Sequence, residues 1–249
     1  MGVPRAWRLA ICGLAVVGLT ACGTDTRLRG TDPPPAVPHG SPAATPSDDG
    51  EVRITDQGSS VITDDGRRIT YAVVLENTSR DVAWNAKVTL QLVDSGGRPV
   101  ADESVDAHEL TGQTTIAPGG QGAVTGTLYL DGNRAAGVRA TLGDVEWWPV
   151  PDGEAPLATF TTSGISHAPS NHSFEILTFG VESDHDQASG SPTATVVFRD
   201  KTGAVIGGAE DRLRGGPIPP GRCRRQVKVD PVPGADPART QVFLTPQQR

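Results

Sequence analysis

Apolar residues recur at every second position in short runs, and this pattern restricts the fold of the chain more than any other feature. Ile69, Tyr71, Val73 and Leu75 alternate with other side chains. Because successive side chains of a β-strand point to opposite faces, these four residues share one face of an extended strand. The other face is mixed in character, as in a half-buried antiparallel sheet. No stretch has the spacing of an amphipathic helix, so the sequence predicts an all-β fold.

Turn-forming residues separate the alternating runs. Asp64-Asp65-Gly66 precedes the strand around Tyr71, and Asp94-Ser95-Gly96-Gly97 ends the run from Ala86 to Leu92. Glycine adopts positive φ at little cost, and Asp tolerates it, so both motifs favour tight hairpins. Further strands are predicted within residues 123–130 and 138–147.

The second half of the sequence repeats this order about 105 residues later. The corresponding segments are 69–76 and 174–181, 86–94 and 194–200, 123–130 and 222–229, and 138–142 and 240–244. Residues 149–156, which contain three prolines and a glycine, are typical of a linker between the copies. The sequence therefore predicts two tandem β-sandwiches, at residues 51–148 and 157–249.

Both copies share a pattern of strand ends and turns. The matching residues are Asn77, Leu90-Gln91-Leu92-Val93-Asp94, Gly97 and Pro118-Gly119 in the first copy, and Val196-Val197-Phe198-Arg199-Asp200, Gly203 and Pro220-Gly221 in the second. This pattern resembles the FxLYD and late-embryogenesis-type immunoglobulin-like sandwiches of bacterial envelope proteins. Val93 and Arg199 stand where that family has Tyr. The resemblance implies immunoglobulin-like domains with a binding or spacer role and no catalytic residues.

The N-terminus has the layout of an export signal. Arg5 and Arg8 precede an uncharged apolar run from Leu9 to Leu19, which is shorter than the roughly 20 residues that span a bilayer. The run ends at Leu19-Thr20-Ala21-Cys22, which resembles the lipobox of bacterial lipoproteins. The resemblance implies cleavage before Cys22, a diacylglyceryl thioether on its sulfur and anchoring in the cell membrane on the extracytoplasmic face. An ordinary secretory signal is the alternative.

Residues 22–50 are predicted to form a disordered tether after the signal peptide of residues 1–21. The segment is rich in Pro, Ala, Ser, Thr, Gly and Asp and contains almost nothing apolar to bury. After cleavage and lipidation, Cys223 is the remaining thiol, so no intrachain disulfide is expected. Cys223 shares a strand face with Val227 and Val229, which favours a core position, although neighbouring arginines would favour a thiolate at an exposed one.

The motifs of familiar chemistry are missing from the sequence. The histidines, at positions 39, 108, 167, 172 and 185, lack metal-ligand spacing, and no hydrolase or nucleotide-binding signature occurs. His167, His172 and Asp184-His185-Asp186 are predicted to lie in loops of the second copy, and their convergence on a metal is a minor alternative. We therefore expect no metal, no cofactor and no enzymatic activity. With 22 basic and 29 acidic residues, and a net charge of -7, nucleic acid is not an expected partner.

Two classes of function remain. We favour a protein-interaction or spacer module, with the membrane as one partner through Cys22 and an envelope protein as another. The alternative is an extracytoplasmic receptor for a small ligand or glycan. Trp147 and Trp148 are the candidate contact residues. Being adjacent on a strand, they should point to opposite faces, so that one enters the core and the other seals the interdomain junction or meets a partner.

Overall fold

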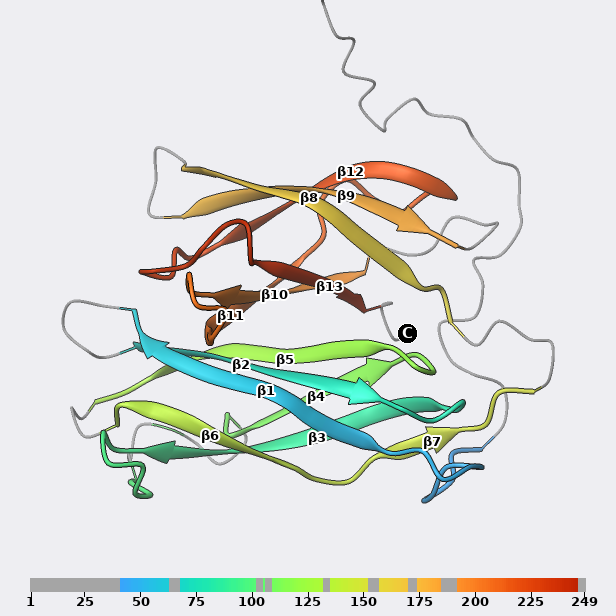
Figure 1. Ribbon diagram of the computed structural model, residues 1–249, viewed down its shortest axis with the longest axis horizontal. Helices are drawn as coiled ribbons and strands as arrows, with labels where there is room; N and C mark the ends of the chain where they lie inside the picture. The colour runs from blue at the N-terminus through green and yellow to red at the C-terminus, as the bar shows by residue number, and fades with distance from the viewer. Residues whose placement is uncertain are drawn as a thin grey trace, which may run out of the picture.

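The computed structural model describes residues 41–62, 68–101, 105, 109–131, 135–151, 157–169, 174–184 and 192–245. Within these ranges every regular element is a β-strand and every sheet is antiparallel, which confirms the all-β expectation (Figure 1). The predicted signal peptide, Cys22, and residues 23–40 of the predicted tether lie outside the described residues.

The strands fall into two sets along the chain. The first half contains β1 (Val52–Val61), β2 (Arg68–Asn77), β3 (Val82–Val93), β4 (Thr111–Ile116), β5 (Gln121–Tyr129), β6 (Gly137–Leu142) and β7 (Glu146–Trp148). The second half contains β8 (Phe160–Pro169), β9 (Glu175–Ser183), β10 (Thr193–Arg199), β11 (Val205–Arg212), β12 (Gly221–Val229) and β13 (Gln241–Thr245).

The strand order of the first half is repeated in the second. The first half forms sheets β1-β2-β5 and β4-β3-β6, with β7 added to β3, and the second half forms sheets β8-β9-β12 and β11-β10-β13. Thus β1 to β6 occupy the same sheet positions as β8 to β13. The segments that the sequence analysis matched as repeats are β2 with β9, β3 with β10, β5 with β12 and β6 with β13.

A shared turn shows the repeat in atomic detail. The Asp94 carboxylate accepts hydrogen bonds from the Gly96 and Arg98 amides at 2.8 and 2.9 Å. In the second half, Asp200 accepts from the Thr202 and Ala204 amides at 2.8 and 3.0 Å. The glycine that follows each aspartate by three residues has positive φ, 76° at Gly97 and 96° at Gly203, which a residue with a Cβ adopts at a cost.

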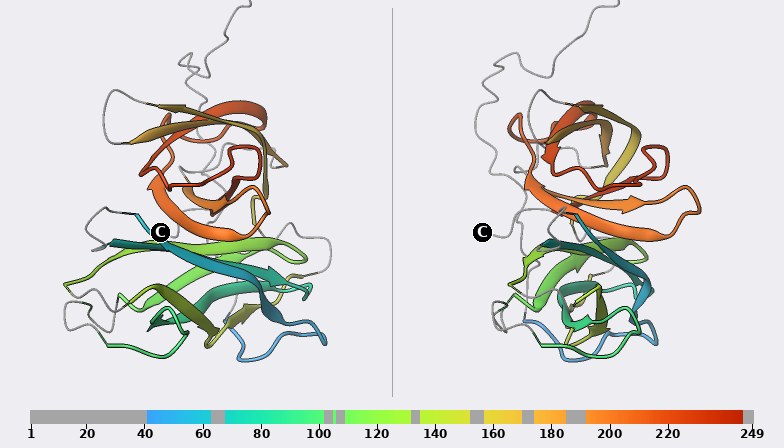
Figure 2. Two further views of the ribbon diagram at one scale, coloured as in Figure 1. Left: turned by 60° about the vertical axis from the view of Figure 1, so that its left-hand side comes forward. Right: turned by 90° about the vertical axis from the view of Figure 1, so that its left-hand side faces the viewer.

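Each half encloses its own apolar core between its two sheets, so each is β-sandwich-like. Ile69, Leu75 and Leu90 are at most 2% exposed in the first core. Leu177, Phe179 and Phe198 are fully buried in the second. The four sheets lie as stacked layers, with β1-β2-β5 facing β11-β10-β13 at the middle of the stack (Figures 1 and 2).

Cys223 belongs to the second core, where it is 8% exposed, as its strand periodicity predicts. Arg225 points to the same side of β12 and is 4% exposed. Its guanidinium donates to the carbonyl oxygens of Pro217 and Arg224 at 2.6 and 3.3 Å. These carbonyl groups replace water around the two terminal nitrogens of the buried charge, whereas the Nε atom has no hydrogen-bond partner among the described residues.

The end of the predicted tether is folded against the first half, which corrects the expectation of disorder up to residue 50. Ala43 and Trp147 exchange backbone hydrogen bonds of 2.7 and 2.9 Å. Within this segment, Asp48 accepts from the Ser79 hydroxyl at 2.6 Å and from the Arg80 amide at 2.9 Å. The Ser79 hydrogen bond is the main cause of a pKa of Asp48 below its ordinary value. Composition missed this segment because its bonds go to residues distant in sequence.

A buried amide closes the end of the first core. Asn77 is 0% exposed, and its side-chain nitrogen donates to the carbonyl oxygens of Asp81 and Ile116 at 2.8 and 3.2 Å. Its side-chain oxygen accepts from the Ser79 amide at 2.9 Å. Asn77 therefore joins the end of β2 to the starts of β3 and of the β4–β5 turn.

Replacing this amide should destabilise the chain. Asn77→Ala leaves several buried backbone groups without a hydrogen-bond partner, so we expect the free energy of unfolding to fall by about 2–3 kcal/mol. Gln91→Ala, at an exposed position of β3, is the control and should stay within about 0.5 kcal/mol of the parent. Urea unfolding followed by circular dichroism measures both, and equal stabilities of the two variants would contradict this role.

Candidate functional site

The two predicted contact residues lie on opposite faces of β7, as strand geometry requires. Trp147 is 5% exposed and belongs to the first core. Trp148 is 9% exposed and packs with Val82, Trp84 and Leu157, and its ring centroid lies 6.1 Å from that of Trp84. Leu157 is the first described residue after the predicted linker. Trp148 thus contacts the start of the second half, while neither indole forms an exposed platform.

The main junction between the halves lies elsewhere, on the outer faces of β2 and β5. Ala72, Val74 and Ala123 form a buried cluster with Val197 of β10 and Val205 of β11. Sequence analysis missed this surface because the second face of β2 was interpreted as half-solvated. The sequence did contain a signal, because β2 and β10 have apolar residues at consecutive positions. Both strands are buried along almost their whole length, whereas β9 and β12 alternate between buried and more exposed residues. A strand buried on both faces has a near-continuous apolar run.

Glycines bring the two backbones into close contact at this junction. A Cβ on Gly58 of β1 would lie 1.8 Å from the carbonyl oxygen of Val205. At the next point along β11, the Thr70 hydroxyl donates to the Gly208 carbonyl at 2.5 Å, and the Gly208 amide donates back to the hydroxyl at 3.0 Å. Ser60 donates to the Ile206 carbonyl at 2.7 Å. Side chains of one half therefore complete the hydrogen bonding of a strand in the other.

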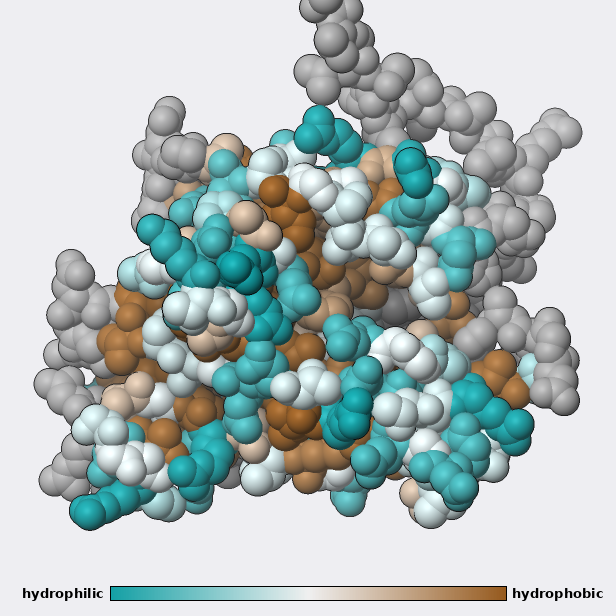
Figure 3. Space-filling model, viewed as in Figure 1, coloured by the Kyte–Doolittle hydropathy of each residue, from teal (hydrophilic) through white to brown (hydrophobic). Residues whose placement is uncertain are grey.

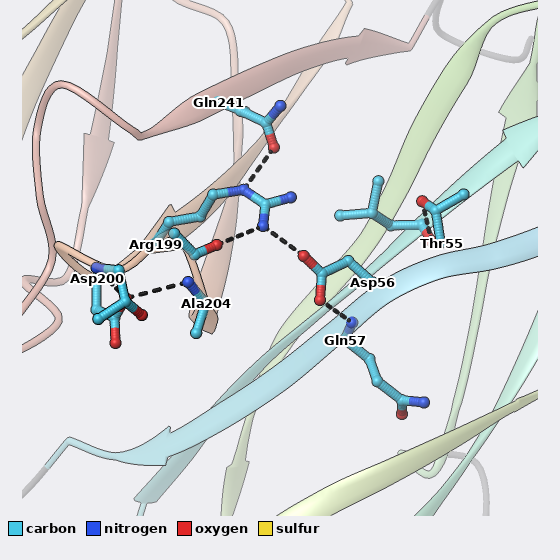
Figure 4. Close-up of polar contacts among 10 residues, drawn as sticks. Thr55, Asp56, Gln57, Arg199, Asp200, Ala204 and Gln241 are labelled. Carbon is cyan, nitrogen blue, oxygen red and sulfur yellow. Dashed lines mark hydrogen bonds and ion pairs between the residues drawn. The ribbon is translucent and has the colours of Figure 1, made fainter.

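Arg199 and Asp56 form an ion pair across the edge of the junction (Figure 4). The same guanidinium donates to the Gly203 carbonyl at 2.8 Å and to the Gln241 side chain at 3.0 Å. The Arg199 side chain is 17% exposed and that of Asp56 is 37% exposed, so solvent screens the pair and its stabilisation is of the order of 1 kcal/mol or less. Arg199 occupies the position at which the family that the sequence resembles has Tyr, and here its side chain joins the two halves.

A cleft of about 290 Å³ opens at one end of the junction. Its lining includes Thr70, Thr127, Glu210, Lys228 and Asp230. Burial raises the pKa of Glu210. Burial, and secondarily the charge of Glu210, raises the pKa of Tyr71 to about 12. At the rim, Arg68 pairs with Asp230 at 3.1 Å, which ties β2 to the end of β12. The cleft is at the small end of the range for ligand pockets.

His167 lies in strand β8, not in a loop as the sequence suggested. Its Nδ1 atom is 3.0 Å from the Glu175 carboxylate and its Nε2 atom is 3.2 Å from the Thr240 hydroxyl. Asp184 accepts from the Thr159 amide at 2.9 Å. His172 and the residues His185 and Asp186 lie outside the described residues. The described residues contain no cluster of three metal-ligating side chains.

In the part of the chain that the structure describes, no helix is long and apolar enough to span a membrane. The chain matches no protein-family model. No curated protein matches it either.

The close approach at Gly58 predicts a strong effect of one methyl group. In Gly58→Ala the new Cβ meets a backbone oxygen, so the halves must separate or β1 must shift, and we expect a loss of about 1–3 kcal/mol in the free energy of unfolding. Gly143→Ala is the matched control, because its Cβ would have ordinary contacts at 3.5 Å. Urea unfolding of both variants tests this, and a Gly58→Ala midpoint no lower than that of Gly143→Ala would refute the observed packing.

The raised pKa of Tyr71 predicts a loss of stability in alkali. The folded chain disfavours the tyrosinate, so the stabilisation is complete below pH 10 and is lost as the pH rises from 10 to about 12. Over that interval the loss should reach about 2–3 kcal/mol and should be absent in Tyr71→Phe. Tyr129→Phe, at a residue 62% exposed, is the control and should retain the loss. Unfolding free energies measured at several pH values decide between these results.

Proposed function

We propose that the chain is a lipid-anchored protein of the bacterial cell membrane whose extracytoplasmic part is a non-catalytic spacer or protein-interaction module. In this proposal the folded part consists of two immunoglobulin-like β-sandwiches stacked face to face. The observation that carries it is the junction in which β2 and β10 are buried on both faces, because a buried apolar junction restricts motion between the two halves, as a spacer requires.

The anchor is supported by the N-terminal sequence. Leu19-Thr20-Ala21-Cys22 follows a charged and then apolar segment, in the order of a lipoprotein signal. Each buried methylene of a lipid on Cys22 contributes about 0.8 kcal/mol, so two or more acyl chains give stable attachment. Residues 23–40, rich in proline, then separate the lipid from the folded part. In polyproline II conformation they reach roughly 55 Å.

The immunoglobulin-like assignment is supported by the repeated strand order and by the equivalent turns at Asp94 and Asp200. A non-catalytic role is supported by the positions of the described polar residues. Asn77 closes a core, Arg199 joins the halves, and His167 is held between Glu175 and Thr240. In each case the polar atoms form hydrogen bonds or ion pairs within the protein that stabilise the fold.

A receptor for a small ligand or glycan is the second candidate, and the cleft beside Glu210 favours it. Glycans need exposed aromatic platforms, whereas Trp147 and Trp148 are both buried. We therefore rank the receptor below the spacer. Native mass spectrometry of the isolated protein separates them, because a co-purifying small molecule supports a receptor and a bound envelope protein supports an interaction module.

The anchor is tested by comparing the parent chain with Cys22→Ala in the bacterial host. We expect the parent in the membrane fraction, with an intact mass that places a lipid on an N-terminal Cys22. Cys22→Ala should be uncleaved or released, without the lipid mass. Cys223→Ala is the matched control and should fractionate like the parent. Soluble and unlipidated protein in all three cases would show that the chain is simply secreted.

A further inference from the structure

The outer face of β12 carries a row of cations. Arg222, Arg224, Gln226 and Lys228 are all exposed, and they alternate with the buried Cys223, Arg225, Val227 and Val229. Arg214 forms an isolated bridge with Gln226 and is also exposed. Because residues paired in an antiparallel bridge project to the same side, the Arg214 side chain belongs to this face. We define Arg214, Arg222, Arg224 and Lys228 as the β12 basic face.

Few carboxylates form ion pairs with this face, although Lys228 also lines the cleft that contains Glu210 and Asp230. Arg222 pairs with Glu182 at 2.9 Å. Among the described residues, no carboxylate lies within ion-pair distance of Arg214, Arg224 or Lys228. The Lys228 ammonium lies 3.6 Å from the centre of the Phe174 ring, which positions the cation without neutralising it. Opposite Arg224, the neighbouring strand has Gly180, so the Arg224 guanidinium stands beside bare backbone.

The β12 basic face also lies apart from the acidic part of the molecule. Residues 51–148 contain 14 acidic and 8 basic residues, whereas residues 157–249 contain 9 acidic and 10 basic residues. The sheet with β12 is the layer farthest from the sheet with β3, and hydrophilic residues protrude at that end of the stack (Figures 1 and 3). This separation gives the protein a polarised charge distribution, which orients an anionic partner toward β12.

We propose that the β12 basic face binds a flexible linear polyanion with phosphodiester groups. Outward side chains of one strand recur about every 6.8 Å, so Arg224 and Lys228, four residues apart on β12, contact charges about 14 Å apart on an extended chain. Arginine binds two phosphate oxygens at once, and the hydroxyl groups of Ser163 and Thr178 lie on the neighbouring strands as further donors.

A soluble chain fits this face better than a membrane surface does. The large apolar residues exposed in the described part of the chain are Val61 and Tyr129, and both lie in the first half. The β12 basic face therefore has no large, exposed apolar side chain that could insert among lipids. This proposal does not depend on the lipid anchor, since the recognition resides in the second half alone.

Binding of poly(glycerol phosphate) to the purified full-length chain tests the proposal. With three unpaired cations engaged, affinity should fall about twentyfold between 50 and 200 mM salt. In the double variant Arg214→Gln/Arg224→Gln, the same change of salt should reduce affinity only about threefold, and affinity at 50 mM salt should be clearly lower. Both side chains are exposed, so the variant should unfold at the same urea concentration as the parent.

The double variant Lys87→Gln/Lys201→Gln is the matched control, because it removes the same charge at exposed positions away from β12. It should bind like the parent. The proposal is overturned by undetectable binding at 50 mM salt or by equal losses in the two double variants. It is also overturned by tighter binding of single-stranded DNA of equal charge, or by binding to phosphatidylglycerol vesicles without binding to the soluble polymer.

Discussion

The contact between the two middle sheets is the constraint on which the rest of the structure depends. Gly58 of β1 has no space for a Cβ atom because the Val205 carbonyl of β11 lies against it, and Gly208 of β11 has none because the Thr125 side chain of β5 does. The Thr70 hydroxyl then serves as donor to the carbonyl and acceptor from the amide of one residue of the opposite half, Gly208. Because these hydrogen bonds are buried, losing them costs more than a solvent-exposed bond would.

This contact divides the sheets into two kinds. The middle sheets are covered on both faces, and their central strands β2 and β10 consist mainly of apolar residues. The outer sheets are covered mainly on one face, so β12, and β3 from Ala86 to Leu92, alternate between buried and exposed residues. In the described part of the chain these outer sheets offer an open face to a partner, and the one containing β12 carries cations that have no ion-pair partner among the described residues.

Local patterns explain why so much of the strand order could be predicted. The period of two at Tyr71 and Leu90, and the Asp–Gly turns after Asp94 and Asp200, act over a few residues and are visible in the sequence. The polar contacts were harder to predict. The Asp48 carboxylate accepts a hydrogen bond from Ser79, which is 31 residues away in the sequence, and Asp56 pairs with Arg199, which is 143 residues away. No local pattern distinguishes these carboxylates from solvated ones.

By itself, the sequence determined the all-β class and the order of the repeated strands, and it favoured a core position for Cys223, because alternation and turn chemistry are properties of short segments. Tertiary structure decided that the halves meet face to face through Ala72, Val74 and Val197, and that Trp147 and Trp148 are buried. The physical reason is that this packing requires two distant surfaces to match in shape, with glycine on one side where backbone lies on the other.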